Sequence, residues 1–127
     1  MVIFGKKDIS LLELILRLGV FGTFLGHGIF ALLQKVTWLP FLTFWGISEK
    51  TGLQLMIVIG VVDIFVAVIT LLKPISSILL YATAWAFLTA LMRPISGGML
   101  LEFIERSANW ATPFALYLFL RFRSSPD

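Results

Sequence analysis

Residues 52–72 read GLQLMIVIGVVDIFVAVITLL, and this run is the strongest indication of the fold class. It holds a single charged residue, Asp63, and it matches the roughly 20 apolar residues that a helix needs to cross a bilayer. Lys73 and Pro74 follow directly, and this pair is typical of a helix end. The stretch therefore predicts a membrane-spanning helix, and the flanking sequence is interpreted as part of a membrane protein.

The composition of the whole chain agrees with this prediction. Of its 127 residues, 59% are hydrophobic and 13% are charged. A soluble domain has about 45–50% apolar residues and about 25% charged residues. The chain has no cysteine, which excludes disulfides, thiolate metal sites, iron–sulfur clusters and cysteine nucleophiles. Basic residues occur singly or in pairs at segment ends, as is typical of membrane proteins. The net charge of +3 therefore predicts contact with the lipid bilayer and does not predict binding of nucleic acid.

Three further spans are predicted around this stretch, at residues 9–34, 75–92 and 99–120. The expected fold is therefore all-α, with a four-transmembrane-helix bundle in a single transmembrane domain over residues 1–127 and a short polar tail at 121–127. Residues 35–51 are too few to span and are broken by Pro40 and Gly46. Their aromatic residues predict an interfacial anchor, and a lid over a binding site is the alternative.

Four spans place both termini on the same side of the membrane. Lysine and arginine are enriched in cytoplasmic loops, so their distribution predicts the orientation. The side with the termini holds Lys6, Lys7, Lys73, Arg121 and Arg123, and the other side holds Lys35, Lys50 and Arg93. Both termini are therefore expected in the cytoplasm. The compact form suggests a multi-pass protein of a bacterial inner membrane.

The first predicted span separates polar and small residues on opposite faces. At about 100° per residue, Arg17 and His27 lie within about 40° of Glu13 around the helix. Gly22 and Gly26 lie on the far side, with the spacing that lets two helices approach closely. Three alanines of the third span have the same spacing, so we expect the glycines to pack on Ala82, Ala86 and Ala90. A homodimer through the glycines is the alternative.

The last predicted span also gathers its polar residues on a single face, and depth along the helices then predicts two polar clusters. The outer cluster would hold His27, Glu102, Glu105 and Arg106. The inner cluster would hold Glu13, Arg17, Asp63 and Asn109, with Arg17 paired to Asp63. Four acids against two arginines inside the spans predict an acid-rich pocket that binds a ligand or moves protons or a cation. Ion pairs that only set the helix register are the alternative.

The residue pattern gives little support to a metal site or a catalytic site. Bundle metal sites usually use Glu-x-x-His pairs, and His27 is the single histidine of the chain. No nucleophile–base pair or cofactor fingerprint is visible either. We therefore expect no metal site and no independent enzyme.

Several short motifs resemble the DoxX-like family of small four-helix membrane proteins. The first is Arg17-Leu-Gly19 followed by Gly26-His27-Gly28. The second is Gly60-x-x-Asp63, where members usually have Gly-x-x-Glu, and the third is Glu105-Arg106-x-x-Asn109-Trp110 with Pro113. Ala31 stands where members often have a lysine, so a role tied to that lysine is not expected here.

The resemblance implies a four-helix membrane fold and, in some members, a link to quinone chemistry, to oxidative-stress partners or to receptor assembly. It leads to the hypothesis of a ligand-binding or accessory subunit, whose pocket takes a quinone or lipid-like ligand or which assists a membrane redox partner. The alternatives are a small proton- or cation-coupled transporter and a structural partner protein that docks on another membrane subunit. Quinone is the cofactor that the resemblance suggests.

Overall fold

The computed structural model describes residues 5–124, and every regular element in that range is a helix. The elements in chain order are α1 (Lys6–Leu32), η1 (Val36–Trp38), α2 (Leu39–Thr43), α3 (Glu49–Leu72), α4 (Ser76–Ile95), α5 (Leu100–Glu105) and α6 (Ser107–Ser124). By length and composition α1, α3 and α4 can cross a membrane. Residues 121–124 of the predicted polar tail belong to α6, and residues 125–127 lie outside the described range.

Local chemistry explains where the long helices begin and end. The Ser48 hydroxyl caps α3 by accepting from the Thr51 backbone N–H at 3.3 Å, which satisfies one of the donors left free at a helix start. Lys73 is extended, and Pro74 cannot continue the helix. The next helix, α4, runs through Pro94 to Ile95. It ends before Gly97, whose φ angle is 108°. Arg93-Pro94 therefore does not end the helix, contrary to the predicted limit at residue 92.

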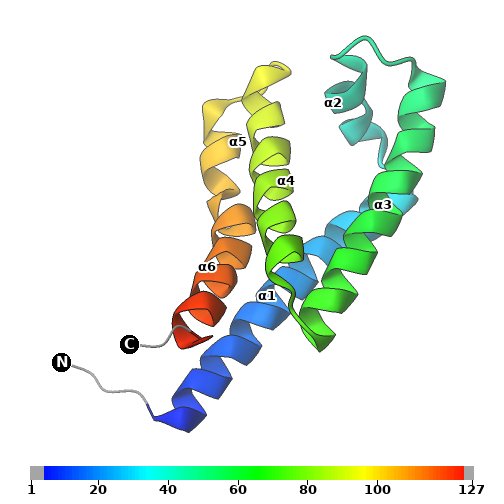
Figure 1. Ribbon diagram of the computed structural model, residues 1–127. Helices are drawn as coiled ribbons and strands as arrows, with labels where there is room; N and C mark the ends of the chain where they lie inside the picture. The colour runs from blue at the N-terminus through cyan, green and yellow to red at the C-terminus, as the bar shows by residue number, and fades with distance from the viewer. Residues whose placement is uncertain (1–4, 125–127) are drawn as a thin grey trace.

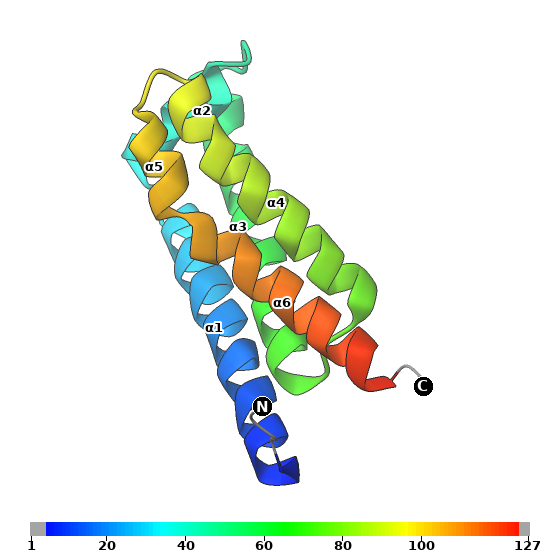
Figure 2. The same cartoon turned by 90° about the vertical axis from the view of Figure 1, so that its left-hand side faces the viewer.

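The long helices form two closely packed pairs, α1 with α3 and α4 with α6. In Figure 2, α6 lies between α1 and α4, and it contacts both. The turn at residues 73–75 joins α3 to α4, and from there the two helices diverge toward the end where α2 and α5 lie (Figure 1). The start of α1 and the end of α6 lie near the turn, at the opposite end of the molecule.

The core lies where the four long helices meet. Val20 and Phe24 of α1 are fully buried there, against Leu79 of α4 and Leu116 of α6. Between helices that lie in a membrane, such packing stabilises the fold through van der Waals contacts, because the lipid tails are as apolar as these side chains. At about 100° per residue, Val20 and Phe24 lie on the same side of α1 as Glu13. The polar stripe predicted from the sequence therefore lies on the inward face of α1.

The structure does not show the predicted contact between Gly22 and Gly26 and the alanines of α4. A Cβ added at either glycine would meet nothing within 4 Å. The reason is that α1 turns its larger apolar side chains inward, which buries more surface than the glycine face could. The main partner of α4 is α6. The three alanines of the predicted contact are nevertheless buried, at Ala82, Ala86 and Ala90.

The close approach of two helices occurs instead at Gly28 of α1 and Gly60 of α3. A Cβ on Gly60 would lie 2.8 Å from the Gly28 carbonyl oxygen and 2.9 Å from the Leu32 backbone nitrogen. Both clashes are with backbone, which cannot move aside as a flexible side chain does. These two glycines therefore set the contact between α1 and α3.

The predicted span at 99–120 is interrupted. Its first part is α5, and Arg106 (φ −94°, ψ 14°) separates it from α6. The Ser107 hydroxyl donates to the Ile104 carbonyl at 2.6 Å, a local bond of the kind that competes with the helical ladder. The break makes α5 a separate short helix, which still packs against α4, where the Phe103 and Phe87 rings meet edge to face at 5.5 Å.

Candidate functional site

A cavity of about 470 Å³ opens between the diverging halves of α3 and α4, near η1, α2 and the α5–α6 break. This volume is typical of a small-molecule site. Most of its lining is apolar, and three of the four tryptophans of the chain belong to it. The larger apolar and aromatic lining residues are Trp38, Phe41, Trp45, Met56, Ile59, Trp85 and Met92.

Residues 36–45 form one wall of this cavity. Phe41 lies under the Arg93 guanidinium, with 4.5 Å between its ring centroid and Cζ, and the ring of Trp38 meets His27 edge to face at 5.6 Å. The segment leaves α1 through Gln34 (φ 54°), whose side-chain amide donates to the Leu53 carbonyl of α3 at 3.1 Å. The aromatic linker thus folds against the helices and lines the cavity.

Asp63 is the buried carboxyl of this cavity. Its side chain projects from α3 one turn after Gly60, and only 3% of the residue is exposed. Its Oδ1 atom has no hydrogen-bond partner among the described residues. A buried polar group without a partner costs about 1–3 kcal/mol, so such groups are rare in stable folds and point to a function.

Two arginines face the same cavity, and the sequence analysis anticipated only one of them. Arg106 lies at the helix break, and Arg93 comes from the end of α4, where it had been interpreted as a helix stop. The Nε atom of each is buried and has no hydrogen-bond partner within residues 5–124. Their proximity is visible only in the folded chain, because the two residues belong to different helices.

The polar lining is completed by His27 and Asn109, so the predicted site residues His27, Asp63, Arg106 and Asn109 meet in one cavity. The predicted carboxylates Glu102 and Glu105 do not line it. Glu105 is exposed, and Glu102 accepts from the Met99 backbone N–H at 3.3 Å. With one carboxyl against two guanidinium groups, the cavity is not acid-rich. The reason lies in α5 itself, where Glu102 caps the helix start and Glu105 belongs to the exposed side of the helix.

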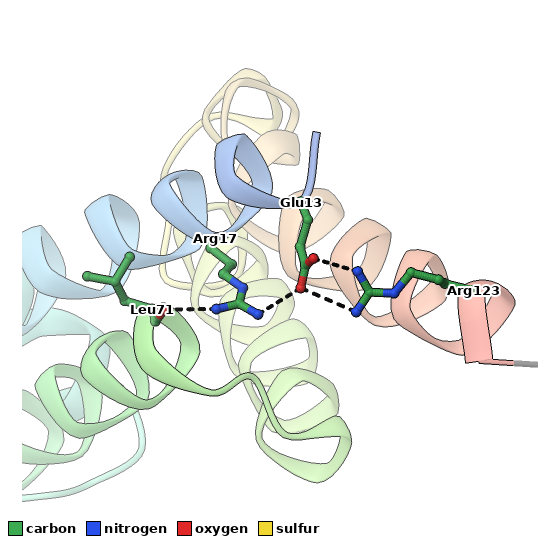
Figure 3. Close-up of polar contacts among 4 residues, drawn as sticks. All are labelled: Glu13, Arg17, Leu71 and Arg123. Carbon is green, nitrogen blue, oxygen red and sulfur yellow. Dashed lines mark hydrogen bonds and ion pairs between the residues drawn. The ribbon is translucent and has the colours of Figure 1, made fainter. Parts of the chain in front are cut away.

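The remaining predicted residues, Glu13 and Arg17, lie at the other end of the molecule. The Glu13 carboxylate pairs with Arg17 at 2.7 Å and with Arg123 of α6 at 2.6 Å, and Arg17 also donates to the Leu71 carbonyl at 3.2 Å (Figure 3). Leu71 lies in the last turn of α3, where carbonyl groups lack helical partners and attract cations. The predicted pair of Arg17 with Asp63 is therefore wrong, because Arg17 lies level with the end of α3.

Within residues 5–124, no group of three or more histidine, aspartate and glutamate residues could hold a metal ion. The cavity can instead hold a molecule that exchanges hydrogen bonds with its polar end. Asp63 can accept a hydrogen bond there, and Arg93, Arg106 and Asn109 can donate.

Comparison with known proteins identifies no relative of this chain. No protein-family model matches the chain, and no curated protein or solved structure matches it either. The resemblance to the DoxX-like proteins therefore stays a prediction based on the short motifs.

Proposed function

We propose that this chain is a DoxX-like integral membrane protein that binds a small amphipathic ligand in the cavity around Asp63. It would act as a ligand-binding or accessory subunit for a quinone or lipid-like molecule or for a membrane redox partner. The observation that carries the proposal is the buried Asp63 carboxyl, which has an oxygen without a partner in an otherwise largely apolar cavity. A ligand with a hydroxyl or amine group would supply the missing donor.

Residence in a membrane is supported by the outer surface of α3. Val58, Val61 and Phe65 are each more than half exposed, and water would not favour this apolar face. For α6 we propose a fourth crossing, because its 18 residues extend about 27 Å, close to the thickness of the hydrocarbon core. Four crossings would place both termini on one side, the cytoplasmic side of a bacterial inner membrane by the distribution of basic residues.

The cavity lining suggests how the ligand would lie. A ring or chain of the ligand would contact Trp85, Met56 and Met92, and its polar end would lie between α3 and the two arginines. A quinol hydroxyl can donate to Asp63, and a quinone carbonyl can accept from Arg93 or Arg106. The divergence of α3 and α4 supports entry of a membrane-dissolved ligand from the side (Figure 1).

Quenching of tryptophan fluorescence tests the proposal directly, since Trp38, Trp45 and Trp85 line the cavity. Detergent-purified protein would be titrated with decylubiquinol and decylubiquinone, and native mass spectrometry of protein from its own membranes would report other retained molecules. Asp63→Leu should abolish saturable binding. Thr70→Val is the matched control, because Thr70 is a buried α3 residue with an unpartnered hydroxyl that does not line the cavity.

Two outcomes would contradict the proposal. One is that the protein binds neither quinone species and retains no small molecule from the membrane. The other is that Asp63→Leu and Thr70→Val retain a ligand equally well, which would place the ligand elsewhere in the protein.

The same buried carboxyl favours a second candidate, a proton- or cation-coupled transporter. Intramembrane carboxyls often carry protons or cations, and Asp63 lies well inside the 24-residue helix α3. Flux driven by a pH gradient in proteoliposomes that is lost in Asp63→Asn would favour transport. Saturable ligand binding without flux would favour the binding protein.

A further inference from the structure

We infer that the end of the molecule opposite the cavity carries a second binding site, for the headgroup of an anionic phospholipid. A cleft of about 560 Å³ lies there between the starts of α1 and α4 and the end of α6. Its charged lining residues are Glu13, Arg17, Lys73, Arg121 and Arg123. The site is separate from the Asp63 cavity, and the inference does not depend on the proposed ligand of that cavity.

The charges of the cleft favour an anion. Among the described residues that line it, Arg17, Lys73 and Arg123 stand against the single carboxylate of Glu13, which pairs with the two arginines. The pairing holds the two guanidinium groups in place, as Figure 3 shows, and leaves an excess of positive charge around them. Lys73 extends this charge from the α3–α4 turn, where it is exposed. Basic pockets between membrane helices commonly recognise phosphate headgroups.

The position of the cleft favours a lipid over a dissolved anion. Arg17 bonds to the last turn of α3, so the cleft lies level with the end of a helix that is long and apolar enough to cross the membrane. A phosphate at this level belongs to the headgroup layer of the bilayer. Leu80 and Leu120 also line the cleft and supply an apolar edge along which the first part of an acyl chain can lie.

Native mass spectrometry with defined lipids tests this inference. Dioleoyl-phosphatidylglycerol and dioleoyl-phosphatidylcholine would be titrated in turn onto the detergent-solubilised protein. We expect one tightly held phosphatidylglycerol and clearly weaker binding of phosphatidylcholine. Lys73→Gln should weaken phosphatidylglycerol binding about fivefold, the effect of one basic side chain near an anionic lipid. Lys73 is exposed and lies outside the Glu13 network of Figure 3, so the fold should persist.

The matched control is Lys6→Gln, which removes the same charge from the exposed start of α1 outside the cleft. Its phosphatidylglycerol binding should change less than twofold. Equal binding of the two lipids, or equal loss in the two variants, would overturn the inference. Displacement of phosphatidylglycerol by millimolar inorganic phosphate would show that the cleft recognises the free anion, and this too would overturn the choice of a lipid. Asp63→Leu serves as a further control and should leave phosphatidylglycerol binding unchanged.

Discussion

Gly28 and Gly60 bring the backbones of α1 and α3 into direct contact, since a Cβ atom on Gly60 would lie 2.8 Å from the Gly28 carbonyl oxygen. The contact also places Asp63, because a Cβ on Gly28 would lie 3.2 Å from the Asp63 Cβ. The position of the buried carboxyl in the cavity therefore depends on two residues that have no side chain.

The first prediction concerns this contact. Gly60→Ala should lower the free energy of unfolding by about 1–3 kcal/mol, because the new methyl group meets backbone atoms. The control is Gly22→Ala, where nothing lies within 4 Å and the better helix propensity of alanine should be neutral or stabilising by up to about 1 kcal/mol. Unfolding in mixed micelles with increasing SDS measures both changes. Equal effects of the two substitutions would contradict the assigned contact.

A second prediction concerns the stability cost of Asp63. In ligand-free protein, Asp63→Leu should raise the free energy of unfolding by about 1–3 kcal/mol, because it replaces a buried oxygen that has no partner. Thermal unfolding followed by circular dichroism measures this change. Bound ligand should stabilise the wild type and leave the variant unaffected. A less stable variant would show that the Asp63 carboxyl has a structural partner.

The third prediction separates the two arginines that pair with Glu13. Arg17→Ala should destabilise the protein by about 1.5–3 kcal/mol, because it removes charged hydrogen bonds to both Glu13 and the Leu71 carbonyl. Arg123→Ala should cost less than about 1 kcal/mol, since its side chain is 49% exposed and such pairs are screened by solvent. SDS unfolding of the two variants provides the comparison. The reverse order would mean that the bond from Arg17 to the Leu71 carbonyl does not stabilise the end of α3.

The fourth prediction concerns the aromatic wall of the cavity. Arg93→Gln removes the cation above the Phe41 ring, an interaction worth about 0.5–2 kcal/mol. Hydrogen exchange of a peptide covering residues 36–45 should therefore become faster. Lys50→Gln removes an exposed charge beside the same segment and should leave the exchange rate unchanged. Unaltered exchange in Arg93→Gln would mean that the wall is held by other contacts.

The helices themselves follow from local properties of the chain. The apolar run at 52–72 and its Lys73-Pro74 ending correspond to α3, and the polar stripe of Glu13 on α1 lies inward with Val20. Periodicity predicts such features because each depends on residues close together in the sequence. The break at Arg106 was missed, since it depends on a local hydrogen bond of Ser107 that hydrophobicity does not reveal.

The helical, membrane-type character of the chain and the inward face of its first helix can be derived from the amino-acid sequence alone. The folded structure is needed to show that Asp63 shares a cavity with Arg93, and that Arg17 instead belongs to the opposite end with Arg123. The physical reason is that composition and period report on each helix alone. Which side chains meet depends on where the helices cross, and here that is set by the backbone contact at Gly28 and Gly60.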